Sequence, residues 1–254
     1  CDTKGGYKYY IDEPERLEGD SLRSWLIDSY ATLNQIQADK KLEGRIIFEN
    51  VPSGNIWLTT FAQAMRNGHL VEITHQGFGK NYENTFEIEP YYLRIFKQRW
   101  YVIGRNPYYA WKKKEAEKEG KTYDRPIFRV YGLDRISMVS ITDKVFKMEE
   151  NFSIDDYFNG CCGIILNTDI PMENVVVRAY DKAPDYLRTL PWHPSQKEIS
   201  KDEESAIFSF EVRPTYDFIQ LVMQQGDQVE ILEPASLRNH MKNLANTLTS
   251  YYKI

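Results

Sequence analysis

Two neighbouring segments decide the fold, Tyr91-Tyr92-Leu93-Arg94-Ile95-Phe96 and Arg99-Trp100-Tyr101-Val102-Ile103-Gly104. Both alternate with the period of two that is typical of a β-strand, and only Lys97-Gln98 separates them, which is enough for a tight hairpin turn. Working outward, the same period predicts short strands over 70–75, 86–90, 128–131 and 136–141. Because closure removes exposed strand edges, short antiparallel strands at this spacing favour a small β-barrel.

The pattern changes on either side of this barrel. After a short capped turn of helix at 153–158, strands are predicted over 175–180, 206–212 and 228–232, and helices over 183–189, 216–225 and 235–251. This order indicates an α+β sandwich, which we expect to be ferredoxin-like. Towards the start, a hairpin strand over 5–11 and helices over 21–36 and 57–67 are predicted, the last one ending at Gly68. We therefore predict three parts, 1–67, 68–150 and 151–254, and an α+β fold class overall.

Length and composition exclude several protein classes. The chain has 254 residues, of which 42% are hydrophobic and 27% charged, so it can bury a core and is neither collagen-like nor disordered. No apolar run approaches the roughly 18 residues of a membrane helix, and no signal segment opens the chain. Three cysteines cannot form a disulfide framework, which fits a reducing compartment. We expect a soluble, cytoplasmic protein with no membrane partner.

Charge is distributed unevenly around the net value of −5. Residues 68–148 carry a balance of +5 and the rest a balance of −10, which makes the middle part the candidate for binding an anion. Five lysines there are assigned to a solvated, charged loop, namely Lys112, Lys113, Lys114, Lys118 and Lys121. No phosphate-binding loop, dinucleotide-binding glycine motif, metal-spaced histidine set or nucleophile elbow is present. We therefore expect no catalytic residues, no metal and no cofactor.

Arginines and aromatic residues alternate along the predicted barrel strands. The arginines are Arg94, Arg99, Arg105, Arg129 and Arg135, and the aromatic residues are Tyr92, Trp100, Tyr101 and Tyr131. Guanidinium groups bind phosphate or carboxylate through two hydrogen bonds and aromatic faces stack on bases, so the combination suits a nucleotide or nucleic-acid ligand. In the alternative interpretation the aromatic residues form the core and the arginines pair with Glu87, Glu89 and Asp134. Strand parity puts Arg99 with Tyr101 on one face, and Arg129 with Tyr131, which leaves Trp100 for the core.

These residues carry a resemblance to a known family. The stretches 90–93, 99–104 and Arg129-x-Tyr131-x-Leu133-Asp134-Arg135-Ile136 resemble the WYL-domain family of bacterial transcriptional regulators. The opening residues 1–11 resemble the wing of that family's N-terminal winged helix-turn-helix, and 226–234 with the helix that follows resemble its C-terminal extension. The resemblance covers nearly the whole chain and implies an Sm- or SH3-like five-stranded barrel in the middle. It also implies that the recognition helix precedes the first residue.

The resemblance further implies a function and a site. Members of the family are regarded as ligand-sensing modules that control an attached DNA-binding domain, and some sense single-stranded nucleic acid. By position, His75 stands where the family usually has a tyrosine. Phe86 stands where many members carry an arginine, and Val102 replaces the family's leucine. The ligand-binding residues predicted from both arguments are His75, Tyr92, Arg94, Arg99, Tyr101, Arg105, Arg129, Tyr131 and Arg135.

Three functions follow from these observations. The first is the sensory part of a homodimeric transcriptional regulator, which binds an anionic ligand such as single-stranded nucleic acid or a nucleotide and contacts DNA through its missing N-terminal domain. The second is a protein-interaction or dimerisation module without a small ligand, in which the arginines hold the barrel to the acidic C-terminal domain. The third is an enzyme acting on nucleic acid, which would require clustered carboxylates or a metal.

Overall fold

The structure is a computed structural model that describes residues 55–166 and 169–252. All the described residues belong to one compact unit, Pro52–Ile254. The predicted hairpin strand over 5–11 and the helix over 21–36 lie outside the described residues. Within the described part, no helix combines the length and the apolar character that crossing a bilayer requires.

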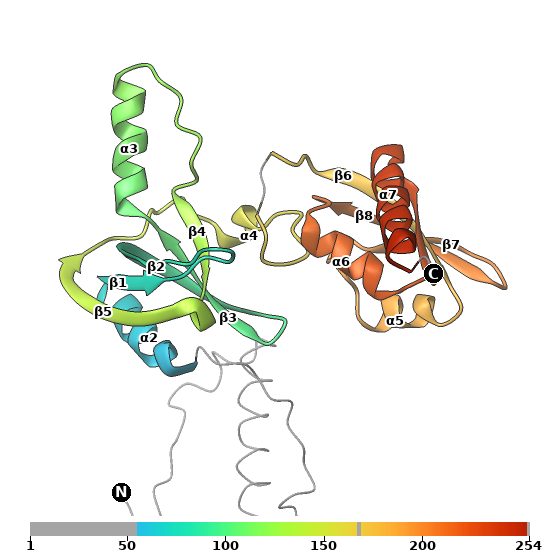
Figure 1. Ribbon diagram of the computed structural model, residues 1–254, viewed down its shortest axis with the longest axis horizontal. Helices are drawn as coiled ribbons and strands as arrows, with labels where there is room; N and C mark the ends of the chain where they lie inside the picture. Colours follow the sequence, from blue (N-terminus) through green and yellow to red (C-terminus); the bar gives the residue numbers. More distant parts are fainter. Residues whose placement is uncertain (1–54, 167–168, 253–254) are drawn as a thin grey trace, which may run out of the picture. The chain divides into compact units, whose positions relative to one another are not determined.

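The first sheet has five antiparallel strands (Figure 1), in the order β4-β3-β2-β1-β5. They are β1 (His69–His75), β2 (Asn84–Phe96), β3 (Arg99–Arg105), β4 (Phe128–Gly132) and β5 (Ile136–Val145). The two strands predicted over 86–90 and 91–96 form one strand, β2, which pairs first with β1 and then with β3. The register shifts just after Pro90, where a residue without an N–H group is tolerated. In the described part β4 and β5 are edge strands that do not pair with each other, so the expected closed barrel is not confirmed.

A short helix supplies much of the core beneath this sheet. The 3-10 turn η3 (Asn55–Trp57) leads into α2 (Leu58–Asn67), whose Phe61 is fully buried in one cluster with Val71 and Val102. As predicted, α2 ends at Gly68, whose φ of 67° is the left-handed conformation that glycine adopts without strain. The indole N–H of Trp57 donates to the carbonyl of Ile136 at 2.9 Å, which ties the start of this unit to β5.

The predicted charged loop after β3 is wrong, because the chain forms the helix α3 (Pro107–Lys118) there. The Asn106 side chain caps the helix by accepting from the Tyr109 N–H at 3.1 Å, and proline at the first position suits a helix start. Lys118 pairs with Glu115 one turn back. Figure 1 shows α3 projecting away from the sheet, and its lysines are exposed, as the solvated interpretation expects.

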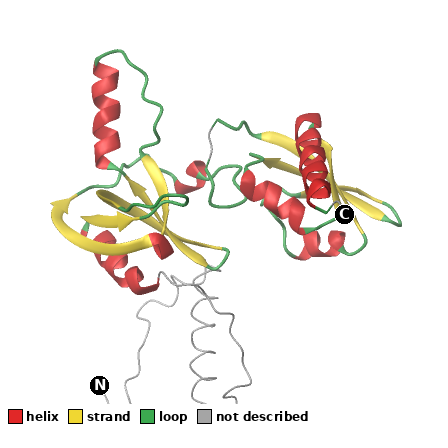
Figure 2. Ribbon diagram, viewed as in Figure 1, coloured by secondary structure: helices red, strands yellow, loops and turns green. Residues whose placement is uncertain are grey.

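The rest of the chain forms a second antiparallel sheet with three helices (Figure 2). A single turn, α4 (Ile154–Tyr157), capped by Ser153, precedes it. The sheet has the order β7-β8-β6-β9, from β6 (Glu173–Tyr180), β7 (Lys197–Lys201), β8 (Ser205–Val212) and β9 (Val229–Glu233). Alternate residues of β6, β8 and β9 share one core with α5 (Ala183–Thr189), α6 (Tyr216–Gln224) and α7 (Ala235–Tyr251).

The fold class is therefore α+β with two antiparallel sheets. The ferredoxin-like description of the second sheet stays a prediction. Strand β7 was not predicted, because all five of its residues are exposed and it carries no alternation of apolar and polar residues that could reveal it.

Candidate anion-binding pocket

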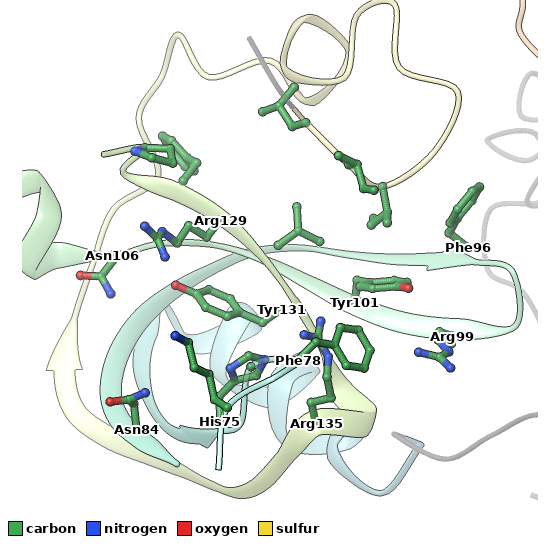
Figure 3. Close-up of a pocket in the computed structure, with 18 of the residues that line it drawn as sticks. His75, Phe78, Asn84, Phe96, Arg99, Tyr101, Asn106, Arg129, Tyr131 and Arg135 are labelled. Carbon is green, nitrogen blue, oxygen red and sulfur yellow. The ribbon is translucent and has the colours of Figure 1, made fainter. Parts of the chain in front are cut away.

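A cavity of about 1410 Å³ lies against the first sheet (Figure 3). Its walls include the end of β1, the starts of β3 and α3, β4, and the 3-10 turn η4 (Leu133–Arg135) that joins β4 to β5. The structure brings six of the predicted residues to this cavity: His75, Arg99, Tyr101, Arg129, Tyr131 and Arg135. Arg99 shares a strand face with Tyr101, and Arg129 with Tyr131, as strand parity requires.

Arg129 and Arg135 are held by aromatic rings. The guanidinium carbon of Arg135 lies 4.2 Å from the ring centre of Phe78, and that of Arg129 lies 4.7 Å from the ring centre of Tyr109. No carboxylate among the described residues forms a salt bridge with either arginine, and each Nε is buried without a hydrogen-bond partner. An aromatic face attracts and orients a guanidinium group without supplying a negative charge. Both positive charges therefore remain available at the cavity.

Backbone space at Gly132 allows Arg135 to take this position. A Cβ atom at Gly132 would come within 3.1 Å of the Arg135 Nε and Nη2 atoms and 2.6 Å of Asp134 Oδ1. These distances are shorter than van der Waals contact, so a larger residue would displace both side chains. Glycine at the end of β4 thus lets the charged groups of η4 fold back against the strand.

Arg99 differs from these two arginines because it has an acidic partner. Its Nη1 atom lies 3.3 Å from Asp134 Oδ2, and its side chain is 41% exposed. The alternative interpretation, in which arginines pair with nearby carboxylates, therefore describes Arg99. Because the Arg99 end of the pair is open to water, Arg99 can exchange its partner for a ligand, whereas Asp134, whose side chain is 17% exposed, stays largely buried.

His75 and Tyr131 supply uncharged polar groups. Burial, together with the positive charge of Arg135, lowers the pKa of His75 to about 4, and its Nε2 atom is buried without a partner. Burial raises the pKa of Tyr131 to about 12, so the phenol keeps its proton. The two rings meet edge to face with centres 5.4 Å apart, and Phe86 packs on Tyr131 at the same distance. At neutral pH the cavity thus presents an imidazole and a phenol beside the arginines. Its lining also includes the carboxylate of Asp217, which already accepts hydrogen bonds from the backbone N–H groups of Ile164 and Ile165.

Three predicted residues do not line the cavity. Arg105 lies 3.0 Å from both carboxylate oxygens of Glu89, which is 8% exposed, and its Nε atom lies 2.9 Å from Glu149 Oε1. The guanidinium carbon of Arg94 lies 4.0 Å from the ring centre of Phe158, and Tyr92 packs in the apolar cluster around that ring. These contacts join the sheet to the segment that follows β5. Ligand binding by the three residues stays a prediction that their positions do not favour.

Sequence reasoning missed two aromatic residues of the site. Phe78 lies in the loop between β1 and β2, and Tyr109 lies in the first turn of α3. A bulky aromatic residue between Gly77 and Gly79, directly after a strand, was a signal that could have found Phe78. Tyr109 was hidden by the incorrect loop prediction. In the described ranges, no group of three or more histidine, cysteine, aspartate or glutamate side chains is placed to hold a metal.

Comparisons with known proteins identify two domains. A WYL domain model matches residues 57–141 and a WCX domain model matches residues 171–249. No curated protein sequence matches the chain. Among solved structures, proteasome accessory factor B/C (PafBC) of Arthrobacter aurescens is 14% identical with a TM-score of 0.30, over 81% of this chain and 28% of that one.

A CRISPR Cas-related protein is also 14% identical, with a TM-score of 0.45 over 76% of this chain and 50% of that one. The chain thus spans half or less of the length of either protein. The first sheet, which carries the cavity arginines, corresponds to the WYL match, and the second sheet to the WCX match. With a WYL domain followed by a WCX domain, the chain belongs to the WYL-domain regulator family.

Proposed function

We propose that this chain is the sensory part of a transcriptional regulator, in which an anionic ligand bound at the WYL cavity controls an attached DNA-binding domain. One observation carries the proposal: the guanidinium groups of Arg129 and Arg135 line a single cavity, and no described carboxylate neutralises either of them. The matches to the WYL and WCX domains support the interpretation of this chain as a regulatory module that senses a ligand. In this proposal DNA is bound by a domain on the N-terminal side, and the regulator acts as a homodimer.

The chemistry of the cavity suits a ligand with paired anionic oxygens, such as a phosphate. A guanidinium group offers N–H donors in a planar fork that matches two oxygens of a phosphate or carboxylate. The aromatic rings already hold Arg129 and Arg135, so less side-chain entropy is lost when an anion binds. His75 and Tyr131 add hydrogen-bonding groups without adding negative charge. A nucleotide or a short single strand of nucleic acid carries the phosphate and is our preferred ligand.

A ligand changes the regulator only if it binds two arrangements with different affinities. The cavity is also lined by Tyr157, Ile164 and Ile165, which belong to the segment between the two sheets. The backbone N–H groups of Ile164 and Ile165 donate to Asp217 in α6, at 2.8 and 2.7 Å. Occupation of the cavity can therefore act directly on the segment that leads to the WCX domain.

Fluorescence polarisation with a labelled single-stranded oligonucleotide of about six nucleotides tests the proposal. Arg129→Gln and Arg135→Gln should each weaken binding about 10- to 100-fold, the range for losing a hydrogen bond to a charged group. The slope of log affinity against log salt should also fall by about one per arginine. Arg188→Gln is the matched control, because it removes the same charge outside the cavity, where Arg188 pairs with Glu198. Equal affinities for all three variants would contradict the proposal.

The interaction-module function receives less support. It requires the barrel arginines to pair with acidic residues of the C-terminal domain. The salt bridges of Arg99 and Arg105 instead end on Asp134, Glu89 and Glu149, which all precede residue 151. Those salt bridges therefore lie within the WYL part itself.

A further inference from the structure

Phe78 is an apolar side chain in an unusual position. It lies in the loop between β1 and β2, is 73% exposed, and lines the same cavity as Arg129 and Arg135. Figure 3 shows its ring beside the guanidinium group of Arg135, at the 4.2 Å given above. Exposing most of a phenyl ring to water is unfavourable, so an occupant that covers the ring would gain free energy from contact with it.

The backbone holds Phe78 in this place. The Gln76 N–H donates to the carbonyl of Arg135 at 3.0 Å, so the loop is anchored on the residue that its aromatic ring covers. The Gln76 side-chain amide donates to the Lys80 carbonyl at 2.7 Å, and the Lys80 N–H donates to the Gly77 carbonyl at 3.1 Å. Gly79, with a φ of 71°, permits the turn. The backbone of this loop is therefore anchored beside Arg135 in the absence of a ligand, which places Phe78 next to the guanidinium group.

We propose that Phe78 is a stacking platform that selects ligands in which a planar aromatic ring is joined to the anionic group. One side of the phenyl ring covers Arg135, and most of its surface remains open to solvent. A planar ring that stacks on the open surface keeps its phosphate within reach of the cavity arginines. This inference rests on the proposed function, because it assigns a second contact to the ligand that those arginines bind. A nucleoside monophosphate has the required chemistry, whereas a sugar phosphate has only the anionic half.

The competing explanation is that Phe78 only shields Arg135. Leucine at this position separates the two roles, because it keeps apolar cover over the guanidinium group but removes the aromatic face. Tyr186→Ala is the matched control, since Tyr186 is 66% exposed on α5 and does not line the cavity. The measurement is isothermal titration calorimetry of the 254-residue chain with adenosine 5′-monophosphate, ribose 5-phosphate and inorganic phosphate.

We expect the unmodified chain to bind adenosine monophosphate about 5- to 150-fold more tightly than ribose 5-phosphate, the range for stacking one base. Phe78→Leu should remove most of this advantage, because the loss of affinity should be larger for adenosine monophosphate than for ribose 5-phosphate, whereas Tyr186→Ala should change neither affinity. Equal binding of the two ligands by the unmodified chain, or an undiminished advantage in Phe78→Leu, would overturn the stacking platform. If ribose 5-phosphate binding then still depends on Arg135, the proposed function survives. If none of the three phosphates binds, the stacking platform fails, and the proposed function fails with it only if the oligonucleotide does not bind either.

Discussion

Acidification should destabilise this protein through His75, by an amount that follows from its burial. The imidazole has an ordinary pKa of 6.5 and a pKa of about 4 in the folded chain, where burial and Arg135 lower it and Asp134 raises it. Between these two values the unfolded chain binds a proton that the folded chain does not, so stability falls as the pH falls. From about pH 7 to about pH 5 the free energy of unfolding should lose about 2 kcal/mol through this one group.

The measurement is urea unfolding followed by tryptophan fluorescence at several pH values, in buffers without phosphate. The His75→Gln variant lacks the titrating group but keeps every carboxylate, so the difference between the two stability curves isolates His75. A saturating phosphate ligand should reduce the difference, because an anion in the cavity favours the imidazolium form. Parallel stability curves for the two proteins over this pH range would refute the reasoning.

Three further predictions concern charged groups inside and beside the cavity. Arg105→Met should lower the free energy of unfolding by about 3–5 kcal/mol, because it leaves the buried carboxylate of Glu89 without a partner; a loss below about 1 kcal/mol in urea unfolding would contradict this. Asp134→Asn should release Arg99 and tighten oligonucleotide binding several-fold in fluorescence polarisation, with a steeper salt dependence, whereas weaker binding would show that the carboxylate positions the site. Asp217→Asn replaces a buried carboxylate that accepts two backbone N–H groups and should cost about 1–3 kcal/mol, which thermal unfolding would detect as a lower midpoint; an unchanged midpoint would count against it.

The sequence predicted those parts of the fold whose signals are local. Alternation of apolar residues located the strands of both sheets except β7, and Gly68 marked the end of α2. Two elements were missed for identifiable reasons. In α3 a run of lysines obscured the start signal of Asn106 and Pro107, and β7 is an exposed edge strand that buries nothing. Closure of the first sheet was also beyond sequence reasoning, because hydrogen bonds between its edges depend on twist and register that no single strand records.

The sequence predicted which types of residue form the site, but not which individual residues line the cavity. Strand parity correctly placed Arg99 and Tyr101 on one face, and those side chains line the cavity. Parity could not exclude Arg105, because its partner Glu89 comes from the neighbouring strand, opposite it in the register. Phe78 and the cavity it borders depend on a loop that returns to Arg135, far along the chain.

Element types, strand faces and the abundance of arginines beside aromatic residues can be read from the chain, because these properties depend on residues within a few positions of one another. Which guanidinium groups are neutralised depends instead on the folded arrangement. Similar local patterns surround four arginines, Arg94, Arg105, Arg129 and Arg135. Three of their guanidinium groups lie over an aromatic ring, whereas that of Arg105 pairs with two carboxylates. Each of those partners comes from another strand, helix or loop. Whether an arginine can bind a ligand is therefore settled by packing between distant segments, which local sequence does not encode.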